Sequence, residues 1–323
     1  LALKDVSTAF LQSNPYPDGK VKYLKMKNPF TGQWELWEQS GPIYGEASAP
    51  VHWENTVAPW LVSLGFVRGD NEPSVFHHPE RDLLVLLYVD DVLMDGFDED
   101  VDWLDAEMDQ RFTCKPIEKL TKDTPIDHLG CDISMDDDHI YLSMKTYIQS
   151  VISLFELDHC PKAETPINEP IDPESESLPP NLSKWFMMGV GSIGWIANTG
   201  RPDIKYFHSR VSQHMARPNY SAYNALIRGL QYLHWSQDWV LCSKLRDDDL
   251  SIQKLFEQGK DADFGWSFYC DSDFAGNAES QNKRRSQNGF IALIDGTPVV
   301  WGSKVSSVAF AHPEIGESHA DIS

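Results

Sequence analysis

The sequence predicts an α+β fold, and three observations support this prediction. Residues 83–94 run Leu-Leu-Val-Leu-Leu-Tyr-Val-Asp-Asp-Val-Leu-Met, a length of apolar chain that fits a buried β-hairpin with two carboxylates at its turn. Residues 50–64 and 145–157 have the apolar spacing of amphipathic helices. Residues 266–301 contain a further strand and a further hairpin. We therefore expect strands and helices in more than one region of the chain.

Composition limits the class of protein. A chain of 323 residues with 41% apolar residues has room for two or more domains and their cores. It contains no apolar run of about 18 residues, so we expect no membrane span, and its first residues lack a signal-peptide pattern. The five cysteines lie far apart, without zinc or disulfide spacing, which favours a reducing compartment. The net charge of −22 argues against a free-standing nucleic-acid binder.

We also expect a fragment of a longer polypeptide. Leu1 is not a start methionine, residues 5–11 begin as though inside a fold, and residues 319–323 stop without a closing element.

The first third of the chain is expected to form strands around one helix. Residues 1–11 predict a strand that leads into a turn or helix start after Asp5. In residues 19–27, lysines nearly alternate with apolar residues, which favours an edge strand with one wet face, although a basic strand could also follow a phosphate backbone. Residues 50–64 predict a helix that Gly65 ends. Its expected apolar stripe is Trp53, Val57, Trp60, Leu61 and Leu64.

The middle of the chain alternates acidic and apolar segments. Residues 95–109 contain eight acids and no Lys or Arg, which predicts a solvated acidic helix packed by one apolar stripe. Residues 126–142 predict two short strands around a solvated turn of three aspartates, and not a Ca²⁺ loop. An amphipathic helix is expected at residues 145–157. Residues 164–180, with five prolines and five acids, predict a linker that builds no packed core.

The last part is expected to be helical and then β-rich. We expect two or three helices, over residues 185–198, 202–216 and 221–235, and an acidic loop at residues 247–249. Residues 266–271 predict a strand that ends in Asp271, and residues 289–301 predict a hairpin that turns at Asp295 and Gly296. A separate small α/β domain from about residue 263 is the natural interpretation.

Three carboxylates are the candidate chemical site. Asp5 ends the first predicted strand, and Asp90 and Asp91 lie in the turn of the apolar hairpin. If these elements are neighbours in one sheet, the carboxylates converge as two-metal phosphoryl or nucleotidyl transfer requires. The alternative is that Asp90 and Asp91 are ordinary turn residues.

The chain resembles the reverse transcriptase of copia-type LTR retrotransposons, followed by its ribonuclease H domain. The resemblance rests on motifs in the family's order, which are Asp-Val-Ser-Thr-Ala-Phe-Leu at 5–11, Ile-Tyr-Gly at 43–45 with Ala-Pro at 49–50 and Trp53, Tyr-Val-Asp-Asp at 88–91, Leu-Gly at 129–130, Tyr-Ile at 147–148, Thr-Pro at 165–166, Gly-Ser at 191–192, Arg-Pro-Asp-Ile at 201–204, Tyr-Cys-Asp-Ser-Asp-Phe-Ala-Gly at 269–276 and Trp-x-Ser-Lys at 301–304. Each motif is weak alone, but their order and spacing are specific.

The resemblance implies a right-hand polymerase fold. The expected parts are a palm with partial fingers, a helical thumb and connection, and a truncated ribonuclease H-like α/β domain. Their expected ranges are 1–125 for the palm with partial fingers, 126–162 for the primer-grip hairpin and thumb start, 163–182 for the linker, 183–260 for the helical thumb or connection, and 261–323 for the incomplete ribonuclease H-like domain.

The resemblance also assigns residues. Asp5, Asp90 and Asp91 would hold two Mg²⁺ or Mn²⁺ ions while a primer 3′-hydroxyl attacks the α-phosphate of a dNTP. Phe10 would lie beneath the sugar and exclude a ribose 2′-hydroxyl, or be simply a core residue. Tyr88 would flank the primer terminus, or be simply a buried hairpin aromatic. Leu129 and Gly130 would lie in the primer grip.

The sequence departs from the family's pattern at several positions. The family's Lys-Gln is replaced by Ala47 and Ser48, preceded by Glu46, which puts template and nucleotide binding in doubt. Met144 replaces a Gln. In the ribonuclease H part, Asp271 would be the first carboxylate, and Glu314 or Glu317 would fill a second position by spacing alone. We therefore expect that ribonuclease H activity is incomplete.

The resemblance implies an RNA-directed DNA polymerase region of a retrotransposon polyprotein. Its partners would be an RNA or DNA template-primer, dNTPs, and other polyprotein segments such as integrase and upstream fingers, with no membrane. It would act in the cytoplasm within a virus-like particle, or in the nucleus. The alternatives are a catalytically inactive remnant that keeps the fold, and a standalone ribonuclease H or other metal nuclease.

Overall fold

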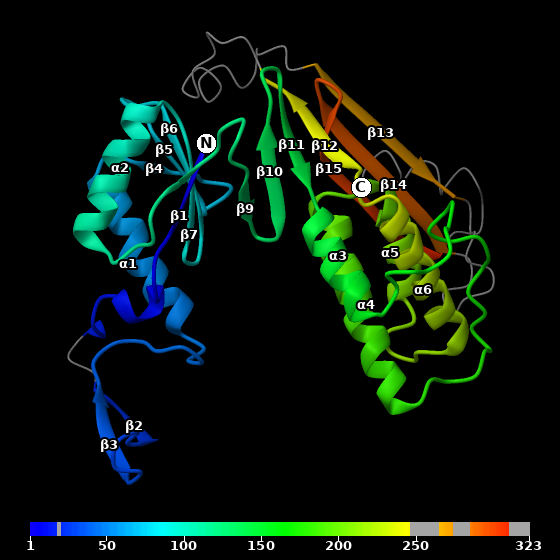
Figure 1. Ribbon diagram of the computed structural model, residues 1–323, viewed down its shortest axis with the longest axis horizontal. Helices are drawn as coiled ribbons and strands as arrows, with labels where there is room; N and C mark the ends of the chain where they lie inside the picture. Colours follow the sequence, from blue (N-terminus) through cyan, green and yellow to red (C-terminus); the bar gives the residue numbers. More distant parts are fainter. Residues whose placement is uncertain (18–20, 246–264, 274–284, 310–323) are drawn as a thin grey trace. The chain divides into compact units, whose positions relative to one another are not determined.

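The computed structural model describes residues 1–17, 21–245, 265–273 and 285–309. The chain divides into two compact units, which we describe separately (Figure 1). Unit 1 holds residues 1–120, and unit 2 holds the described residues from 121 onward. Within the described ranges, we find no helix with the length and apolar character needed to cross a membrane.

The main sheet of unit 1 is antiparallel, and its strand order is β4-β5-β6-β7-β1-β8 (Figure 1). Its strands are β1 (Ala2–Asp5), β4 (Val67–Arg68), β5 (Val75–His78), β6 (Leu83–Tyr88), β7 (Asp91–Asp95) and β8 (Glu118–Lys119). The predicted apolar hairpin is confirmed as β6 and β7. The first strand of the chain, β1, lies directly beside β7, so the two predicted strand regions are neighbours in one sheet.

Helices α1 (Ala49–Ser63) and α2 (Asp98–Arg111) cover one face of this sheet. Alternate strand side chains such as Val85 and Met94 are fully buried among the apolar side chains of both helices. On the opposite face, Leu86 of β6 is only half-buried. Because successive side chains on a strand point to opposite faces, the sheet has one covered face and one open face.

The predicted first helix and its end are confirmed. The expected stripe residues Trp53, Val57 and Leu61 of α1 are buried. Gly65 has φ +104°, and a Cβ there would lie 2.8 Å from Nε2 of His78. This position therefore requires glycine on both conformational and steric grounds.

The acidic helix α2 is packed by its predicted apolar stripe, but it is not merely solvated. Asp105 and Asp109 each form an ion pair with Lys4, whose Nζ lies 2.5 and 2.8 Å from their Oδ1 atoms. Lys4 is 1% exposed. Burial lowers the pKa of Lys4, but the hydrogen bonds to Asp105 and Asp109 outweigh it and raise this pKa above its ordinary value. Asp100 is also buried and pairs with Arg81. The acids of α2 thus neutralise cations of unit 1.

A second antiparallel pair in unit 1 joins β2 (Lys22–Lys27) to β3 (Trp34–Gln39), and we call it the ribbon (Figure 1). Strand β2 lies in the segment predicted as a strand. Its partner β3 was not predicted.

Unit 2 begins with an antiparallel sheet of strand order β12-β11-β10-β9. Its strands are β9 (Ile126–His128), β10 (Cys131–Met135), β11 (His139–Ser143) and β12 (Val240–Lys244). The prediction of two strands in residues 126–142 is wrong by one strand, because the turn at Leu129 and Gly130 separates β9 from β10. The aspartate turn between β10 and β11 is confirmed.

The helices of unit 2 share one apolar core. They are α3 (Lys145–Leu154), α4 (Pro180–Thr199), α5 (Lys205–Ser212), which follows the 3₁₀ turn η3 (Pro202–Ile204), and α6 (Tyr220–Trp235). Ile148 of α3, Phe186 of α4, Phe207 of α5 and Leu226 of α6 are buried in this core. The predicted helices are confirmed, although their ends differ by several residues.

The Pro- and acid-rich segment 164–180 contributes to this core, which corrects its prediction as a linker. Ile171 is 5% exposed and Leu178 is 8% exposed. The backbone amide of Leu178 donates to the carbonyl of Pro218 at 2.9 Å. A second backbone hydrogen bond runs from the amide of Tyr220 to the carbonyl of Glu176 at 3.0 Å. Buried apolar side chains and backbone hydrogen bonds thus attach the segment to the rest of unit 2, whatever its average composition.

The last described strands form an antiparallel sheet of order β13-β14-β15, with β13 (Trp266–Ser272), β14 (Arg285–Ile294) and β15 (Thr297–Ala309). The predicted strand and hairpin are confirmed. The turn between β14 and β15 uses Asp295 and Gly296, both with positive φ. The sheet packs against α5, and Nε1 of Trp301 donates to the carbonyl of Ala197 at 2.7 Å. The predicted acidic loop at residues 247–249 lies outside the described residues.

Candidate functional site

The turn between β6 and β7 is held in an unusual backbone conformation. Val89 has φ 54°, a left-handed value that costs a β-branched residue about 1–3 kcal/mol. The indole Nε1 of Trp53 donates to the carbonyl of Val89, and the amide of Val6 donates to the carbonyl of Asp90 at 2.8 Å. Because Trp53 is 2% exposed, its indole is a fixed donor. The turn that carries Asp90 is therefore fixed by α1 and by the residue that follows β1.

Two of the three candidate carboxylates are direct neighbours. Asp5 and Asp91 are register partners of β1 and β7, so their side chains lie on the same face of the sheet. This is the open face, and both residues are half-buried. Asp90 precedes Asp91 in the turn. The backbone thus places all three carboxylates at one end of two adjacent strands.

Lys115 is a basic residue at this site that sequence reasoning missed. Its Nζ lies 2.8 Å from Oδ2 of Asp5, and its amide donates to the carbonyl of Asp5 at 2.9 Å. The hydrogen bond to Asp5 raises the pKa of Lys115, and the charges of Asp90 and Asp91 raise it further. Since 110 residues separate Lys115 from Asp5, no local sequence pattern could have revealed the pair.

Tyr44 connects these carboxylates to Phe10. Burial raises the pKa of the Tyr44 hydroxyl, and the charges of Asp90 and Asp5 add to this effect. The ring centroids of Tyr44 and Phe10 are 4.9 Å apart. Phe10 itself is half-buried and packs against the core of unit 1. Phe10 therefore contacts a tyrosine whose pKa responds to the charges of two of the candidate carboxylates.

Tyr88 is 51% exposed. It is the register partner of Asp91, so its ring lies on the open face of the sheet beside the carboxylates. The alternative prediction, that Tyr88 is simply a buried aromatic of the hairpin, does not explain this exposure.

The residue types fit a divalent cation, but their side chains are not assembled around one point. Carboxylate oxygens are the protein ligands that Mg²⁺ prefers. In the part of the chain that the structure describes, however, no three side chains of Asp, Glu, His or Cys form a group that could hold a metal ion. A cation bound by Asp5 would compete with the ammonium group of Lys115 for Oδ2.

Glu46, which precedes the two replaced motif positions Ala47 and Ser48, is the half-buried centre of a hydrogen-bond hub. Its carboxylate accepts from the Tyr16 hydroxyl at 2.7 Å, from Ser48 Oγ at 2.8 Å and from Gln39 Nε2 at 3.0 Å, and it pairs with Lys22. The hydrogen bonds from Lys22 and Tyr16 lower the pKa of Glu46 to about 2. We call these residues the Glu46 hub. It joins the base of the ribbon to the segment that begins α1.

Leu129 and Gly130 form the β9–β10 turn in unit 2, with φ 56° and 77°. A Cβ on Gly130 would lie 3.5 Å from the ring of Tyr147 and 4.0 Å from Nε1 of Trp195. The turn therefore rests on α3 and α4, and two residues with positive φ are typical of a tight hairpin.

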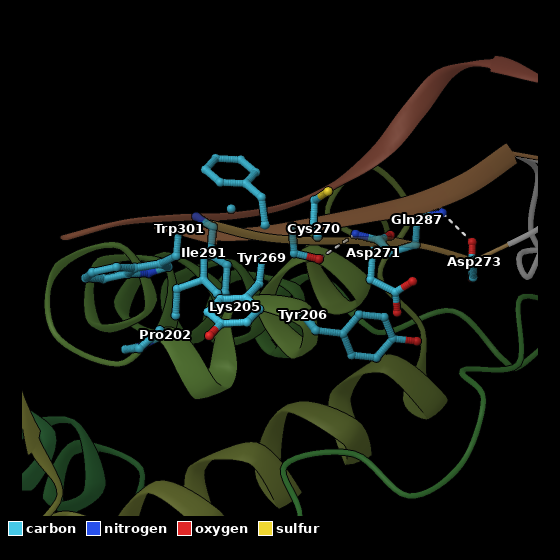
Figure 2. A pocket seen from close by; sticks show the side chains of 14 residues that line it. Pro202, Lys205, Tyr206, Tyr269, Cys270, Asp271, Asp273, Gln287, Ile291 and Trp301 are labelled. Atoms are coloured by element: carbon cyan, nitrogen blue, oxygen red, sulfur yellow. Dashed lines mark hydrogen bonds between the residues drawn. The ribbon is translucent and has the colours of Figure 1, made fainter. Parts of the chain in front are cut away.

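Asp271 lies on β13 at a pocket of about 520 Å³ between α5 and the last sheet (Figure 2). Tyr206 and Lys205 of α5 and Trp301 of β15 line the same pocket. Asp273 does not point freely into it, because its Oδ1 accepts from the amide of Gln287 at 2.5 Å. Glu314 and Glu317, the other candidates for ribonuclease H chemistry, lie outside the described residues.

Comparison with known proteins identifies the class first. A model of the family described as reverse transcriptase (RNA-dependent DNA polymerase) matches residues 3–169, just over half of the chain. The chain therefore belongs to the reverse transcriptase family. The matched range contains the three carboxylates, Phe10 and the β9–β10 turn, and it ends before Asp271.

The relatives are retrotransposon proteins. The chain is 27% identical over 314 residues to a transposon Ty5-1 protein of Saccharomyces cerevisiae, an alignment that covers 93% of this chain and 92% of that protein. It is 28% identical over 268 and 276 residues to the retrovirus-related Pol polyproteins of transposons RE2 and RE1 of Arabidopsis thaliana, with 81% of this chain covered each time. The chain spans only 17% and 16% of those two polyproteins. It is thus a reverse transcriptase region of copia/Ty1-type Pol.

Proposed function

We propose that unit 1 is the palm, with partial fingers, of an RNA-directed DNA polymerase that adds dNTPs to a primer 3′-hydroxyl. The observation that carries the proposal is the register pair of Asp5 and Asp91 on an open sheet face, with Asp90 in a turn pinned by Trp53. A nucleic-acid backbone can lie on an open sheet face, and carboxylates at its end can bind the divalent cations that contact phosphates.

The roles of the residues follow from their positions. Asp5, Asp90 and Asp91 are the proposed ligands of Mg²⁺ or Mn²⁺, and such ions, when bound, neutralise charge on the reacting phosphates. Lys115 holds Asp5 in the absence of a cation. Phe10, supported by Tyr44, presents the wall that would meet a ribose 2′-hydroxyl. Tyr88, exposed beside Asp91, offers its ring to the primer terminus.

Unit 2 holds the proposed remaining parts of the polymerase. The β9–β10 turn at Leu129 and Gly130 is the proposed primer grip, and α3 to α6 are the proposed thumb and connection. The sheet of β13, β14 and β15, with Asp271, is the proposed start of a ribonuclease H-like domain. Integrase and further fingers of a Pol polyprotein are the proposed partners.

Primer extension tests the polymerase proposal. The chain is incubated with a primed RNA template, dNTPs and Mg²⁺ or Mn²⁺. We expect extension that Asp90→Asn abolishes, because this substitution removes a charge but little volume. Asp95→Asn is the matched control, since Asp95 lies at the far, exposed end of β7, the strand that follows Asp90. Extension that survives Asp90→Asn, or that both substitutions abolish alike, contradicts the proposal.

A second candidate function is a remnant that keeps the fold without activity. The ion pair between Lys115 and Asp5, which occupies a proposed metal ligand, favours it. Titration calorimetry with Mn²⁺ separates the two functions. The polymerase proposal predicts binding that is lost in Asp90→Asn and is several-fold tighter in Lys115→Met, because the competing ammonium group is gone. A folded protein that takes up no Mn²⁺ in either form supports the remnant.

A further inference from the structure

The ribbon of β2 and β3 has two faces of different character. In its register, Tyr23 lies opposite Glu38, Lys25 opposite Leu36, and Lys27 opposite Trp34. These six side chains point to one side, because alternate residues of a strand share a face. We call this side the ribbon face. All six residues are exposed, whereas Leu24 and Met26 on the other side are half-buried.

The ribbon face exposes large apolar side chains where a soluble ribbon would carry polar ones. Tyr23 is 63% exposed, Trp34 is 64% exposed and Leu36 is 68% exposed. Contiguous exposed aromatic and aliphatic side chains of this kind mark an interaction surface. Protection of a strand edge by lysines, the simpler explanation of β2, does not account for the aromatics of β3.

The charges of the ribbon face favour an anionic partner. Lys25 Nζ lies 5.6 Å from the centre of the Trp34 ring, so a cation and an aromatic face are presented together. No ion pair engages Lys25 or Lys27 anywhere in the described ranges, whereas Lys22 on the other side is used by Glu46. Glu38 is the acid of this face. On the other side, Glu35 accepts hydrogen bonds from Asn28 and Trp37.

The ribbon is fixed at both ends. At its base, the Glu46 hub joins Lys22 and Gln39 to Tyr16. At its tip, Oδ1 of Asn28 accepts from the amides of Phe30 and Thr31, at 2.8 and 3.1 Å. A surface held in this way does not have to be ordered at the moment of binding, and this lowers the entropic cost of association.

We propose that the ribbon face binds single-stranded nucleic acid, with bases stacked on Trp34 and Tyr23 and phosphates near Lys25 and Lys27. Aromatic platforms beside cations are how proteins hold single strands without reading sequence. An apolar protein partner would use the aromatics but would gain nothing from the two free lysines. The identity of the strand as unpaired template rests on the proposed polymerase function, whereas the binding itself does not.

The test is fluorescence anisotropy with a labelled oligo-uridine of about ten nucleotides, a length within the usual site size. The protein is the full chain, in wild-type form and with Asp90→Asn. We expect Trp34→Ala to weaken binding about tenfold, the loss of one stacked base. Lys25→Gln with Lys27→Gln should reduce the slope of log affinity against log salt by about 1.4, or about 0.7 for each phosphate contact.

Two variants serve as matched controls. Trp37→Ala removes an indole from the other side of the same ribbon, and Lys184→Gln removes an exposed lysine of α4. Neither should change affinity or salt slope. Because Trp34 is mostly exposed, its loss should leave thermal unfolding unchanged.

The proposal is overturned if Trp34→Ala binds like wild type, or if Trp37→Ala is equally weakened. It is also overturned if Trp34→Ala changes only the self-association of the chain, because the ribbon face would then be a protein interface. Binding that persists in Asp90→Asn while primer extension fails separates this proposal from the polymerase function.

Discussion

The Glu46 hub allows a quantitative test of how the ribbon is anchored. Tyr16 is only 7% exposed, and in Glu46→Ala its hydroxyl loses its hydrogen-bond acceptor. A buried donor left without a partner costs about 1–3 kcal/mol. Lys22 is 47% exposed and regains water, so its lost ion pair costs only about 0.5 kcal/mol. We therefore expect Glu46→Ala to destabilise the ribbon by about 2 kcal/mol.

Glu46→Gln separates these two contributions. Its amide oxygen can still accept from Tyr16 and Gln39, and its NH₂ group can donate to Ser48 Oγ, so the ion pair with Lys22 is the main loss. We expect a cost of about 0.5 kcal/mol. Lys22→Met should cost the same amount. Added to Glu46→Gln, it should cost nothing more, because both changes remove one interaction.

Hydrogen exchange of the β2 and β3 amides is the suitable assay, because it reports local opening of the ribbon rather than global unfolding. A cost of about 2 kcal/mol corresponds to roughly 30-fold faster exchange in Glu46→Ala, and about 0.5 kcal/mol to roughly twofold in Glu46→Gln. If Gln proves as costly as Ala, the ion pair dominates and the hydrogen-bond argument is refuted. If neither changes exchange, the hub does not anchor the ribbon.

The hub also predicts the direction of a pH effect. The pKa of Glu46 is lowered from about 4.5 to about 2 in the folded protein. A carboxylate with a lowered pKa contributes stability that is full above its unfolded pKa and is lost as pH falls through the folded value. Ribbon protection should therefore decline between about pH 4.5 and pH 2 in wild type. Glu46→Gln should lack this dependence.

Two further predictions concern buried cations. Arg201 is 2% exposed, pairs with both carboxylate oxygens of Asp203 at 2.8 and 2.7 Å, and donates to Ser236. Because a lysine cannot make this two-pronged contact, Arg201→Lys should lower the free energy of unfolding by about 2–4 kcal/mol, measured by thermal unfolding. In unit 1, Asp105→Ala should cost about 2 kcal/mol in urea unfolding, because it leaves a buried ammonium with one aspartate. Lys4→Met should cost less, since its partners are partly exposed and regain water. Equal costs for the last two variants would refute this reasoning.

The elements that sequence could predict are those with a local signal. The short apolar run of residues 83–94 predicts β6 and β7, and the stripe of Trp53, Val57 and Leu61 with Gly65 predicts α1 and its end. Strand β3 was missed because it has no buried face whose pattern could reveal it. Averaged composition hid the buried Ile171 and Leu178 in the segment predicted as a linker.

The candidate site was predictable only in part, for a related reason. The carboxylates Asp90 and Asp91 stand at the end of a recognisable hairpin, and one strand pairing brings Asp5 to them. Lys115 and the Glu46 hub consist of contacts between residues far apart in sequence, 110 residues for Lys115 and Asp5 and 24 for Lys22 and Glu46. Such contacts follow from tertiary packing and leave no periodic pattern.

Taken as a net charge, the acidity of the chain argues against binding nucleic acid. The ion pairs of unit 1 show where many of these acids are used. Acids of α2 neutralise Lys4, Lys119 and Arg81, and Glu46 neutralises Lys22. These acids hold the structure of unit 1 together and face its own cations. Because screening limits exposed charges to a range of about 8 Å at physiological salt, a strand on the ribbon face responds mainly to Lys25, Lys27 and the one acid of that face, Glu38. Local charge, and not the net −22, then decides whether this protein can bind a polyanion.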